Sequence, residues 1–195
     1  MNGFILASQS PRRKQLLAWA DLQFDIIVSA ADEDFPLDME VQDVPVYIAK
    51  NKALAVQEKI NNELPVHKGK WIIAADTIVV LDNEIIGKPV DREDAIAILK
   101  KLSGKTHRVI TGVYLMNDTD TRFFSETTLV HFHPLTLAQI AYYIDQYQPY
   151  DKAGAYGIQD WIGVIGIKGI EGDFYNVMGL PVSKLLSYLP TTIES

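Results

Sequence analysis

The isoleucine- and valine-rich stretch 71–81 is the feature that most restricts how this chain can fold. It is much shorter than the roughly 18 to 20 apolar residues that a membrane span needs, and Asp76 and Thr77 interrupt it. Isoleucine and valine favour strands, and a run of this kind is typical of a central strand in a sheet. We therefore expect a soluble protein in which one buried strand carries a carboxylate and a hydroxyl group.

Signals for strands and helices are mixed along all 195 residues, and no linker or internal repeat separates them. Strands are expected at 4–7, 71–81, 85–86, 107–116, 123–132 and 162–170, and helices beginning at 11, 44 and 91 and at 137–147 and 180–189. The polar turn 117–120 predicts that the strands on either side of it form a hairpin. Crossover helices combined with hairpins predict one α/β domain, residues 1–195, with a mixed β-sheet flanked by helices.

Composition narrows the possible partners. The chain has 18 basic against 25 acidic residues, a formal net charge of −7, which argues against binding to nucleic acid but leaves a small anionic ligand open. It has no cysteine, which excludes disulfides, thiolate catalysis and cysteine-held metal centres. The short apolar stretch near the N-terminus is followed by basic residues, unlike a secretory signal, so we expect a cytoplasmic protein without membrane contacts.

The segment Ser8-Gln9-Ser10-Pro11-Arg12-Arg13 is the first candidate site. It leads from a strand into a helix, and Ser10 and Pro11 suit the helix start. A helix N-terminus offers free N–H groups to an anion, and arginines in the first turn oppose the usual preference for acidic residues there. The segment fits a phosphate or carboxylate ligand and fits equally a solvated basic turn that pairs with nearby acids.

Asp76 is the second candidate, because a charged carboxylate in a central strand costs several kcal/mol, to order of magnitude, unless it is paired, hydrogen-bonded or bound to metal. It is a candidate metal ligand or general base, and the alternative is a structural aspartate bonded to loop backbone. Glu33, in the acidic run Asp32-Glu33-Asp34, is a candidate second oxygen ligand for Mg²⁺ or is simply solvated.

Two further segments could contact a ligand. Lys88, in Gly87-Lys88-Pro89, follows a hairpin and could point at a polyanion, although surface lysines usually have no such role. The segment 151–159 packs small residues and glycines around polar groups, which fits either a ligand-binding loop or a tight turn. Gln159 could both donate to and accept from a base edge. The histidines lack the spacing of zinc ligands and are interpreted as structural or exposed.

Five motifs and a closing block occur in order along the chain: Leu6-Ala7-Ser8-x-Ser10-Pro11-Arg12-Arg13, Ala75-Asp76-Thr77-x-Val79, Gly87-Lys88-Pro89, Leu102-Ser103-Gly104-x-x-His107-x-Val109-x-Thr111, Asp151-Lys152-Ala153-Gly154-x-Tyr156-Gly157-Ile158-Gln159 and Asn176-Val177-x-Gly179-Leu180-Pro181. Together they resemble the Maf family of nucleoside triphosphate pyrophosphatases. The resemblance implies an elongated mixed sheet with two lobes around a central cleft, similar to inosine triphosphate pyrophosphatases. It also implies hydrolysis between the α- and β-phosphates, with a divalent metal, Mg²⁺ or Mn²⁺.

The resemblance extends to individual residues. Asp76 takes the position of the catalytic proton acceptor, and Asp76 and Glu33 are the expected metal ligands. Arg12, Thr77 and Gln159 match positions associated with substrate choice, in the pattern of the branch that acts on dTTP and UTP and on some modified pyrimidine nucleotides. The phosphate-binding candidates are Ser8, Arg13, Lys52, Lys88 and Lys152.

Other interpretations remain open at this point. A nucleotide-binding regulator of septum formation or cell division is the alternative from another class, although Asp76 argues against a purely binding role. A house-cleaning enzyme for non-standard nucleotides would share the mechanism and differ in its substrate. The resemblance also implies a homodimer, and Tyr142, Tyr143 and Tyr147 on one predicted helix are candidates for the core or for an interface.

Overall fold

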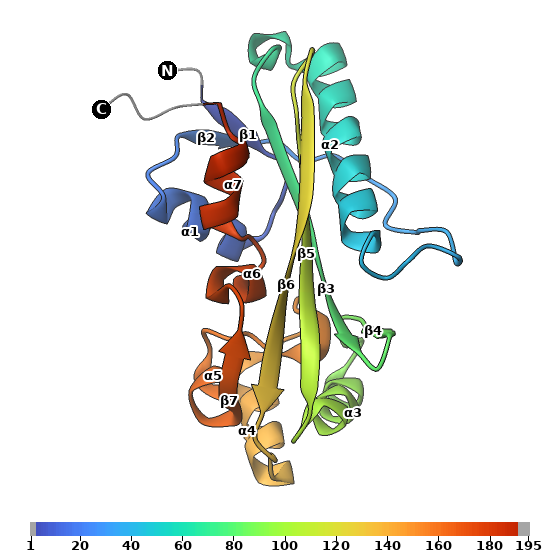
Figure 1. Cartoon of the computed structure of the whole chain (residues 1–195), viewed down its shortest axis with the longest axis vertical. Helices are drawn as coiled ribbons and strands as arrows, with labels where there is room; N and C mark the ends of the chain where they lie inside the picture. The colour runs from blue at the N-terminus through green and yellow to red at the C-terminus, as the bar shows by residue number, and fades with distance from the viewer. Residues whose placement is uncertain (1–2, 191–195) are drawn as a thin grey trace. The chain divides into compact units, whose positions relative to one another are not determined.

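A mixed β-sheet is the framework of residues 3–190, the part of the chain that the computed structural model describes (Figure 1). Its strands lie in the order β2 (Phe24–Ile26), β1 (Phe4–Leu6), β3 (Ile72–Leu81), β5 (Thr106–Met116), β6 (Thr121–Phe132) and β7 (Ile167–Glu171), and β4 (Glu84–Ile86) pairs with β3. Strand β1 is parallel to β2 and β3, whereas β4 is antiparallel to β3 and β7 is antiparallel to β6. The predicted mixed sheet flanked by helices is confirmed.

The described chain divides into two compact units, and each is assembled from separate segments of sequence. Unit 1 contains the described residues up to Asp76, the segment Thr111–Glu126 and the described residues from Gly179 onward. Unit 2 contains Thr77–Ile110 and Thr127–Met178. Strands β3, β5 and β6 therefore contribute residues to both units.

The core of unit 1 forms between helix α2 (Val44–Glu63) and the strands. Ala49, Ala53, Val56 and Ile60 recur at helical spacing along α2 and are buried. They join residues of β1, β3 and β5 in one cluster, which includes Ile5, Ile72, Ala74 and Tyr114. The other helices of unit 1 are α1 (Pro11–Trp19), the short 3₁₀ helix η1 (Pro65–His67) and α7 (Val182–Tyr188).

The start of α2 lies directly against β5 at Gly112. A β-carbon at this position would be 2.2 Å from the backbone nitrogen of Val46 and 2.6 Å from the carbonyl oxygen of Pro45. Those atoms belong to backbone, which cannot move aside as a side chain could. Glycine at position 112 is therefore required for α2 to approach β5 this closely.

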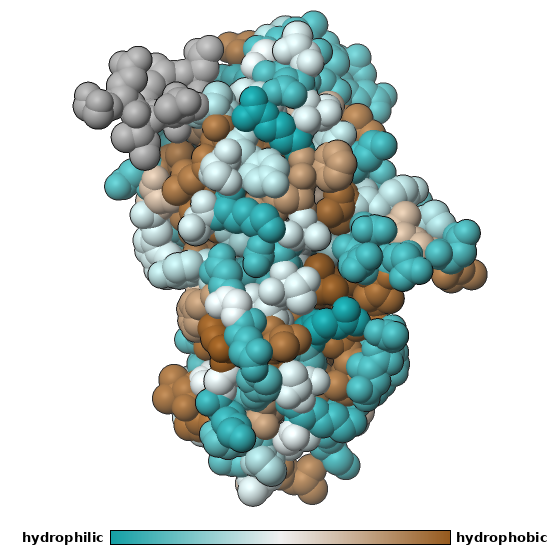
Figure 2. Space-filling view, in the orientation of Figure 1, coloured by the Kyte–Doolittle hydropathy of each residue, from teal (hydrophilic) through white to brown (hydrophobic). Residues whose placement is uncertain are grey.

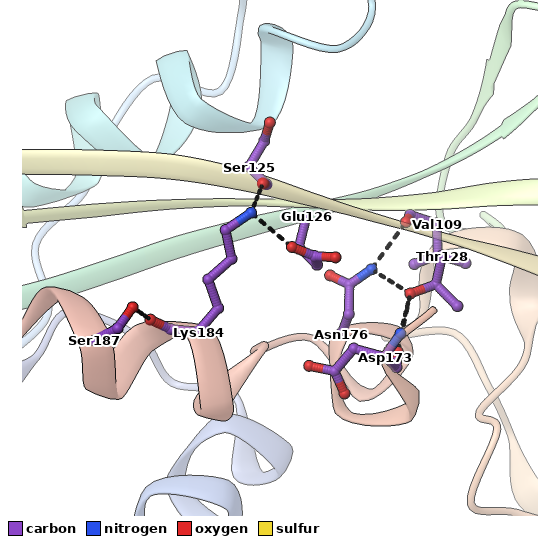
Figure 3. A network of polar contacts seen from close by, with 8 residues as sticks. All are labelled: Val109, Ser125, Glu126, Thr128, Asp173, Asn176, Lys184 and Ser187. Atoms are coloured by element: carbon purple, nitrogen blue, oxygen red, sulfur yellow. Dashed lines mark hydrogen bonds and ion pairs between the residues drawn. The ribbon is translucent and has the colours of Figure 1, made fainter. Parts of the chain in front are cut away.

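Helix α7 is connected to β6 within unit 1 by Lys184 (Figure 3). The Lys184 ammonium donates to the carbonyl oxygen of Ser125 at 2.9 Å and to Oε2 of Glu126 at 2.7 Å. The Ser187 hydroxyl donates to the carbonyl of Lys184 at 2.7 Å, one turn further along the helix. These contacts hold the last helix of the described chain against a strand that lies much earlier in the sequence.

The longer helices of unit 2 begin where their capping residues predict. Helix α3 (Arg92–Leu102) starts after Asp91, whose side chain accepts from the Asp94 backbone N–H at 2.8 Å. Helix α4 (Leu137–Tyr147) starts with a capping box in which Thr136 and Gln139 satisfy each other's backbone N–H groups. The short helices of unit 2 are η2 (Ala153–Ala155), α5 (Trp161–Gly166) and α6 (Phe174–Met178).

A fully buried asparagine joins α6 to the sheet of unit 2 (Figure 3). The Asn176 amide donates to the carbonyl oxygen of Val109 and to Oγ1 of Thr128, both at 3.0 Å. Thr128 in turn donates to the Asp173 carbonyl at 2.9 Å and accepts from the Asp173 N–H at 3.1 Å. Buried polar groups are stable only with such partners, so this network fixes where α6 lies.

The prediction of one strand over 162–170 is wrong. Trp161–Gly166 forms α5, and only Ile167–Glu171 is a strand. A short apolar run fits a strand and a buried helix equally well by pattern alone. In α5 the chain turns closely: a β-carbon on Gly163 would lie 1.8 Å from the carbonyl oxygen of Ile158.

The other predicted elements are present with small shifts at their ends, while β2 and α6 were not predicted.

Within residues 3–190, no helix is both long enough and apolar enough to cross a membrane. The face shown in Figure 2 carries hydrophobic residues in small groups among hydrophilic ones.

Tyr143 of α4 is buried, whereas Tyr142 and Tyr147 of the same helix are exposed. Tyr143 is thus a core residue, whereas Tyr142 and Tyr147 lie on the surface of unit 2.

We expect Gly112→Ala to lower the free energy of unfolding by roughly 1 to 3 kcal/mol, because the added methyl group forces α2 away from β5. Urea denaturation of the wild type and the variant measures this difference. Gly169→Ala is the control, since a β-carbon at Gly169 meets nothing within 4 Å. Equal stabilities for Gly112→Ala and Gly169→Ala would contradict the packing described for α2.

Candidate active site

Two carboxylates of unit 1, from Glu33 and Asp76, contact the Lys52 ammonium. The Lys52 Nζ atom lies 2.7 Å from Oδ1 of Asp76 and 2.8 Å from Oε1 of Glu33. Lys52 comes from α2, Asp76 from β3 and Glu33 from the segment between β2 and α2. Residues that are far apart in the sequence thus form one group, and all three are among the predicted site residues.

The surroundings of β3 explain why Asp76 needs a cation. Residues Ile73, Ala74 and Ala75 before it are fully buried, and the Asp76 side chain itself is only 14% exposed. An ionised carboxylate in such a place is costly unless a partner compensates for the lost hydration. Lys52, whose side chain is 19% exposed, supplies that partner at hydrogen-bond distance.

The segment between β1 and α1 places Ser8 and Arg13 together in unit 1. The Arg13 Nε atom donates to the carbonyl oxygen of Gly179 at 2.8 Å, and its Nη1 atom donates to Oγ of Ser8 at 3.2 Å. Ser8 Oγ also accepts from the backbone N–H of Ser10 at 3.2 Å. Both of these acceptors for Arg13 are uncharged, so they hold the guanidinium in place without cancelling its charge.

The pKa of Arg13 shows which charges surround it. Burial lowers the pKa of Arg13 below its usual value, and Arg12 lowers it further, whereas Asp76 and Glu33 act in the opposite direction. The guanidinium stays protonated, because arginine starts from so high a pKa. Arg13 therefore lies within electrostatic range of the carboxylates that Lys52 joins, and Arg12 lies within range of Arg13.

The basic turn lies near acidic residues. Among the five charged residues that these contacts and the pKa of Arg13 connect, Arg12, Arg13 and Lys52 outnumber Glu33 and Asp76. The surplus positive charge contrasts with the chain's net charge of −7. A local cationic group in an acidic protein favours a small anionic ligand over a large one such as duplex nucleic acid.

Glu33 and Asp76 are also the residues that could hold a metal ion. Their contacts to one ammonium show that a cation can lie close to both carboxylates at once. In residues 3–190 there is no group of three or more histidine, cysteine, aspartate or glutamate residues placed to bind a metal. A pair of carboxylates suits Mg²⁺ or Mn²⁺ when a phosphate ligand and water complete the coordination, so the donor set fits such an ion.

The remaining predicted site residues belong to unit 2. Thr77 follows Asp76 in β3 and is half-buried. Lys88 is exposed, and the carbonyl of Gly87 before it accepts from the Gly154 N–H at 3.0 Å. That bond brings the lysine turn beside the segment that carries Lys152, whose ammonium lies 2.7 Å from Oδ1 of Asp151.

Gln159 is exposed and lies on a compact turn of unit 2. The backbone N–H of Asp160 donates to the Gly157 carbonyl at 3.0 Å, which closes the turn. The hydroxyl of Tyr143 accepts from the Gly157 N–H at 3.0 Å and donates to Oδ2 of Asp160 at 2.7 Å. Gln159 was predicted as a site residue from the sequence. The contacts of Tyr143 and Asp160 with its turn were not predicted, because only the fold brings α4 beside this turn.

Gly179 is another contributor whose role the sequence analysis did not identify. It was noted as part of the block from Asn176 to Pro181, but its use as an acceptor for Arg13 depends on the fold. Two of the histidines have side-chain partners in the fold. His107 is buried, and burial lowers its pKa to about 4. The Nδ1 atom of His131 is 2.7 Å from the Thr106 hydroxyl, and its Nε2 atom is 3.1 Å from Oε1 of Glu171.

The chain is similar to proteins whose names state an activity. It is 46% identical over 192 residues to a protein of Porphyromonas gingivalis named dTTP/UTP pyrophosphatase, with 98% of this chain and 94% of the relative covered. It is 49% identical over 185 residues to a protein of the same name from Cytophaga hutchinsonii, with 95% and 82% covered. Among solved structures, the Staphylococcus aureus Ham1 protein matches with a TM-score of 0.46 and 14% identity over 67% of this chain and 71% of that protein.

The family comparison covers almost the entire sequence. The model of the family described as Maf-like protein matches residues 3–192. This range includes every motif on which the resemblance was based and every residue of the group around Lys52. The match, together with relatives at 46% and 49% identity, shows that the chain belongs to the family of Maf-like proteins.

Proposed function

We propose that this protein is a nucleoside triphosphate pyrophosphatase that hydrolyses dTTP and UTP between the α- and β-phosphates. The products are a nucleoside monophosphate and pyrophosphate. The observation that carries the proposal is the Lys52-bridged pair of Glu33 and Asp76, which lies within electrostatic range of Arg13. Relatives named dTTP/UTP pyrophosphatase, which this chain matches along most of its length, support the choice of substrate.

The cationic residues of unit 1 would bind the phosphates. Arg12, Arg13 and Lys52 offset the repulsion between a triphosphate and an acidic protein, and the Ser8 hydroxyl can donate to a phosphate oxygen. The Lys52 ammonium has three N–H donors, of which Glu33 and Asp76 use two. The third can donate to the substrate while the carboxylates stay in place.

Asp76 is the residue we assign to the water molecule. In the proposed step Asp76 orients a water molecule and accepts its proton, as the water oxygen bonds to the α-phosphorus. The bond from the α-phosphorus to the bridging oxygen breaks, and pyrophosphate leaves with the electron pair of that bond. Lys52, at 2.7 Å from the Asp76 carboxylate, fixes the orientation in which this carboxylate would accept the proton.

A divalent metal would be held by Asp76 and Glu33, the two carboxylates that already converge on one cation. Bound there, Mg²⁺ or Mn²⁺ supplies positive charge next to the phosphates, where negative charge develops during hydrolysis. The residues of this chain would fix the position of that charge relative to Arg12 and Arg13.

Recognition of the base is assigned to Gln159, with Thr77 and Arg12 as further contributors to substrate choice. A glutamine amide can donate to a carbonyl of uracil or thymine and accept from the ring N–H at the same edge. Both bases share that edge and differ by one methyl group, which a pocket distinguishes by only about 1 to 3 kcal/mol. We therefore expect the protein to use both dTTP and UTP.

Lys88 and Lys152 are proposed as additional phosphate contacts.

We further propose that residues 1–195 act as one Maf-like domain. The family match over residues 3–192 supports this, as do the three strands that contribute to both units. The expectations of a homodimer, of a cytoplasmic location and of no binding to nucleic acid stay predictions, as does the choice between standard and modified pyrimidine nucleotides.

With Mg²⁺ or Mn²⁺, we expect the purified protein to release pyrophosphate from dTTP and UTP, and little from CTP, GTP, 7-methyl-GTP and ITP. Pyrophosphate, orthophosphate and monophosphate are assayed separately, with and without a chelator, which is expected to stop the reaction. Orthophosphate as the product would reject cleavage between the α- and β-phosphates. Binding without turnover would favour the nucleotide-binding regulator instead.

We expect Asp76→Asn to lower turnover of every nucleotide by roughly 10² to 10⁴-fold, because the amide can no longer accept the proton. Steady-state kinetics on dTTP and UTP measure the loss. Asp25→Asn is the matched control, since Asp25 also pairs with a lysine, Lys70, at 2.8 Å in unit 1 but is exposed. Full turnover by Asp76→Asn would show that the catalytic assignment is wrong.

Gln159→Glu is expected to change selectivity rather than turnover. The carboxylate cannot donate to a uracil or thymine carbonyl, so kcat/KM for dTTP and UTP relative to CTP should fall roughly tenfold. The ratio is measured with all three substrates in competition. Gln146→Glu, on the exposed surface of α4, introduces the same charge elsewhere in unit 2 and should leave the ratio unchanged.

A further inference from the structure

A single buried hydroxyl group contacts both ends of the turn that carries Gln159. Tyr143 is fully buried, and its ring stacks against Tyr147 one turn along α4, with ring centres 5.1 Å apart. Its hydroxyl accepts from the Gly157 N–H at 3.0 Å and donates to Oδ2 of Asp160 at 2.7 Å. Packing fixes the ring, so the hydroxyl is a fixed point for both residues.

The Tyr143 hydroxyl keeps its proton. Burial raises the pKa of Tyr143 well above its usual value, and the hydrogen bond to Asp160 raises it further. The hydroxyl therefore remains protonated near neutral pH and donates to the Asp160 carboxylate. A hydrogen bond to a charged group is stronger than one between neutral groups, so this contact contributes more than the bond from Gly157.

The turn leaves little room around Gly157. A β-carbon on Gly157 would lie 2.5 Å from Oδ2 of Asp160 and 2.9 Å from Nε2 of Gln159. The Gln159 amide thus lies close to Gly157, and Tyr143 contacts both ends of the turn that carries it. A shift of either end would move the amide that we assign to base recognition.

The part of the chain before the turn has its own anchors. The hydroxyl of Tyr156 is 2.7 Å from Nε2 of His107, and the Gly154 N–H donates to the carbonyl of Gly87 at 3.0 Å. These contacts do not involve Tyr143. Removing the Tyr143 hydroxyl would therefore release the Gly157–Asp160 turn while the preceding segment stays in place.

We propose that Tyr143 and Asp160 are positioning residues for substrate choice, which hold the Gln159 amide where it meets the pyrimidine edge. The proposal rests on the proposed function of Gln159. Tyr143 and Asp160 act through the turn and do not touch the substrate themselves. Their contribution lies in the affinity for pyrimidine nucleotides and in the discrimination against other bases, while the chemical step depends on Asp76.

The test compares Tyr143→Phe with the wild type on dTTP, UTP and CTP. We expect KM for dTTP and UTP to rise roughly tenfold, with kcat changed by less than about twofold. The kcat/KM ratio of dTTP over CTP should fall by a similar factor. Tyr114→Phe is the matched control, because it removes a hydroxyl from a buried tyrosine of unit 1.

A second pair of variants separates positioning from general damage to the fold. Asp160→Ala should reproduce the change in the ratio, while Asp160→Asn, whose amide oxygen still accepts from Tyr143, should restore most of it. Asp160 is only half-buried, so this pair carries the test if Tyr143→Phe fails to fold. Thermal unfolding of each variant identifies such a failure.

Two outcomes would overturn the inference. One is an unchanged dTTP over CTP ratio in Tyr143→Phe or Asp160→Ala. The other is a fall in the ratio that persists in full in a Gln159→Ala background, because residues that act through Gln159 lose their effect when it is absent. If the wild type releases no pyrophosphate from any nucleotide, the proposed function itself is wrong, and this is visible before any variant is made.

Discussion

Two carboxylates that approach the same point repel each other, and the Lys52 ammonium between Glu33 and Asp76 is what makes their proximity stable. The lysine reaches them from α2, and the start of the same helix packs against β5 at Gly112, where a side chain would not fit. One methyl group on β5 would thus displace the helix that carries the cation. The ion pairs of Lys52 consequently depend on the packing of α2 against β5.

The two halves of the proposed activity depend on different kinds of interaction. Around Lys52 the contacts join charged groups from α2, β3 and the segment after β2, so the function of each group depends on the presence of the others. Around Gln159 the contacts run from a buried phenol to backbone and to one carboxylate. Charge neutralisation governs the first group, and the geometry of a turn governs the second.

Much of the fold was predictable because local patterns agree with it. The helix over 137–147 has a capping box at its start, and the Ile/Val-rich run with Asp76 forms β3 as expected. The stretch 162–170 was not predictable, since its apolar pattern fits both a strand and α5, and the close approach of Gly163 to Ile158 is visible only in the fold. The site followed the same rule: Asp76 stood out by its apolar surroundings, whereas Tyr143 shows no sequence signal of its contact with Asp160.

The segmental composition of unit 1 has a consequence for the order in which the protein is made. The residues from Gly179 onward belong to unit 1, and they leave the ribosome after the last residue of unit 2, Met178. Arg13 takes its backbone acceptor from Gly179, and Lys184 joins α7 to β6. Helix α1 and strand β6 are therefore synthesised before the residues that complete these contacts, and a nascent chain stalled before Gly179 lacks the acceptor for Arg13.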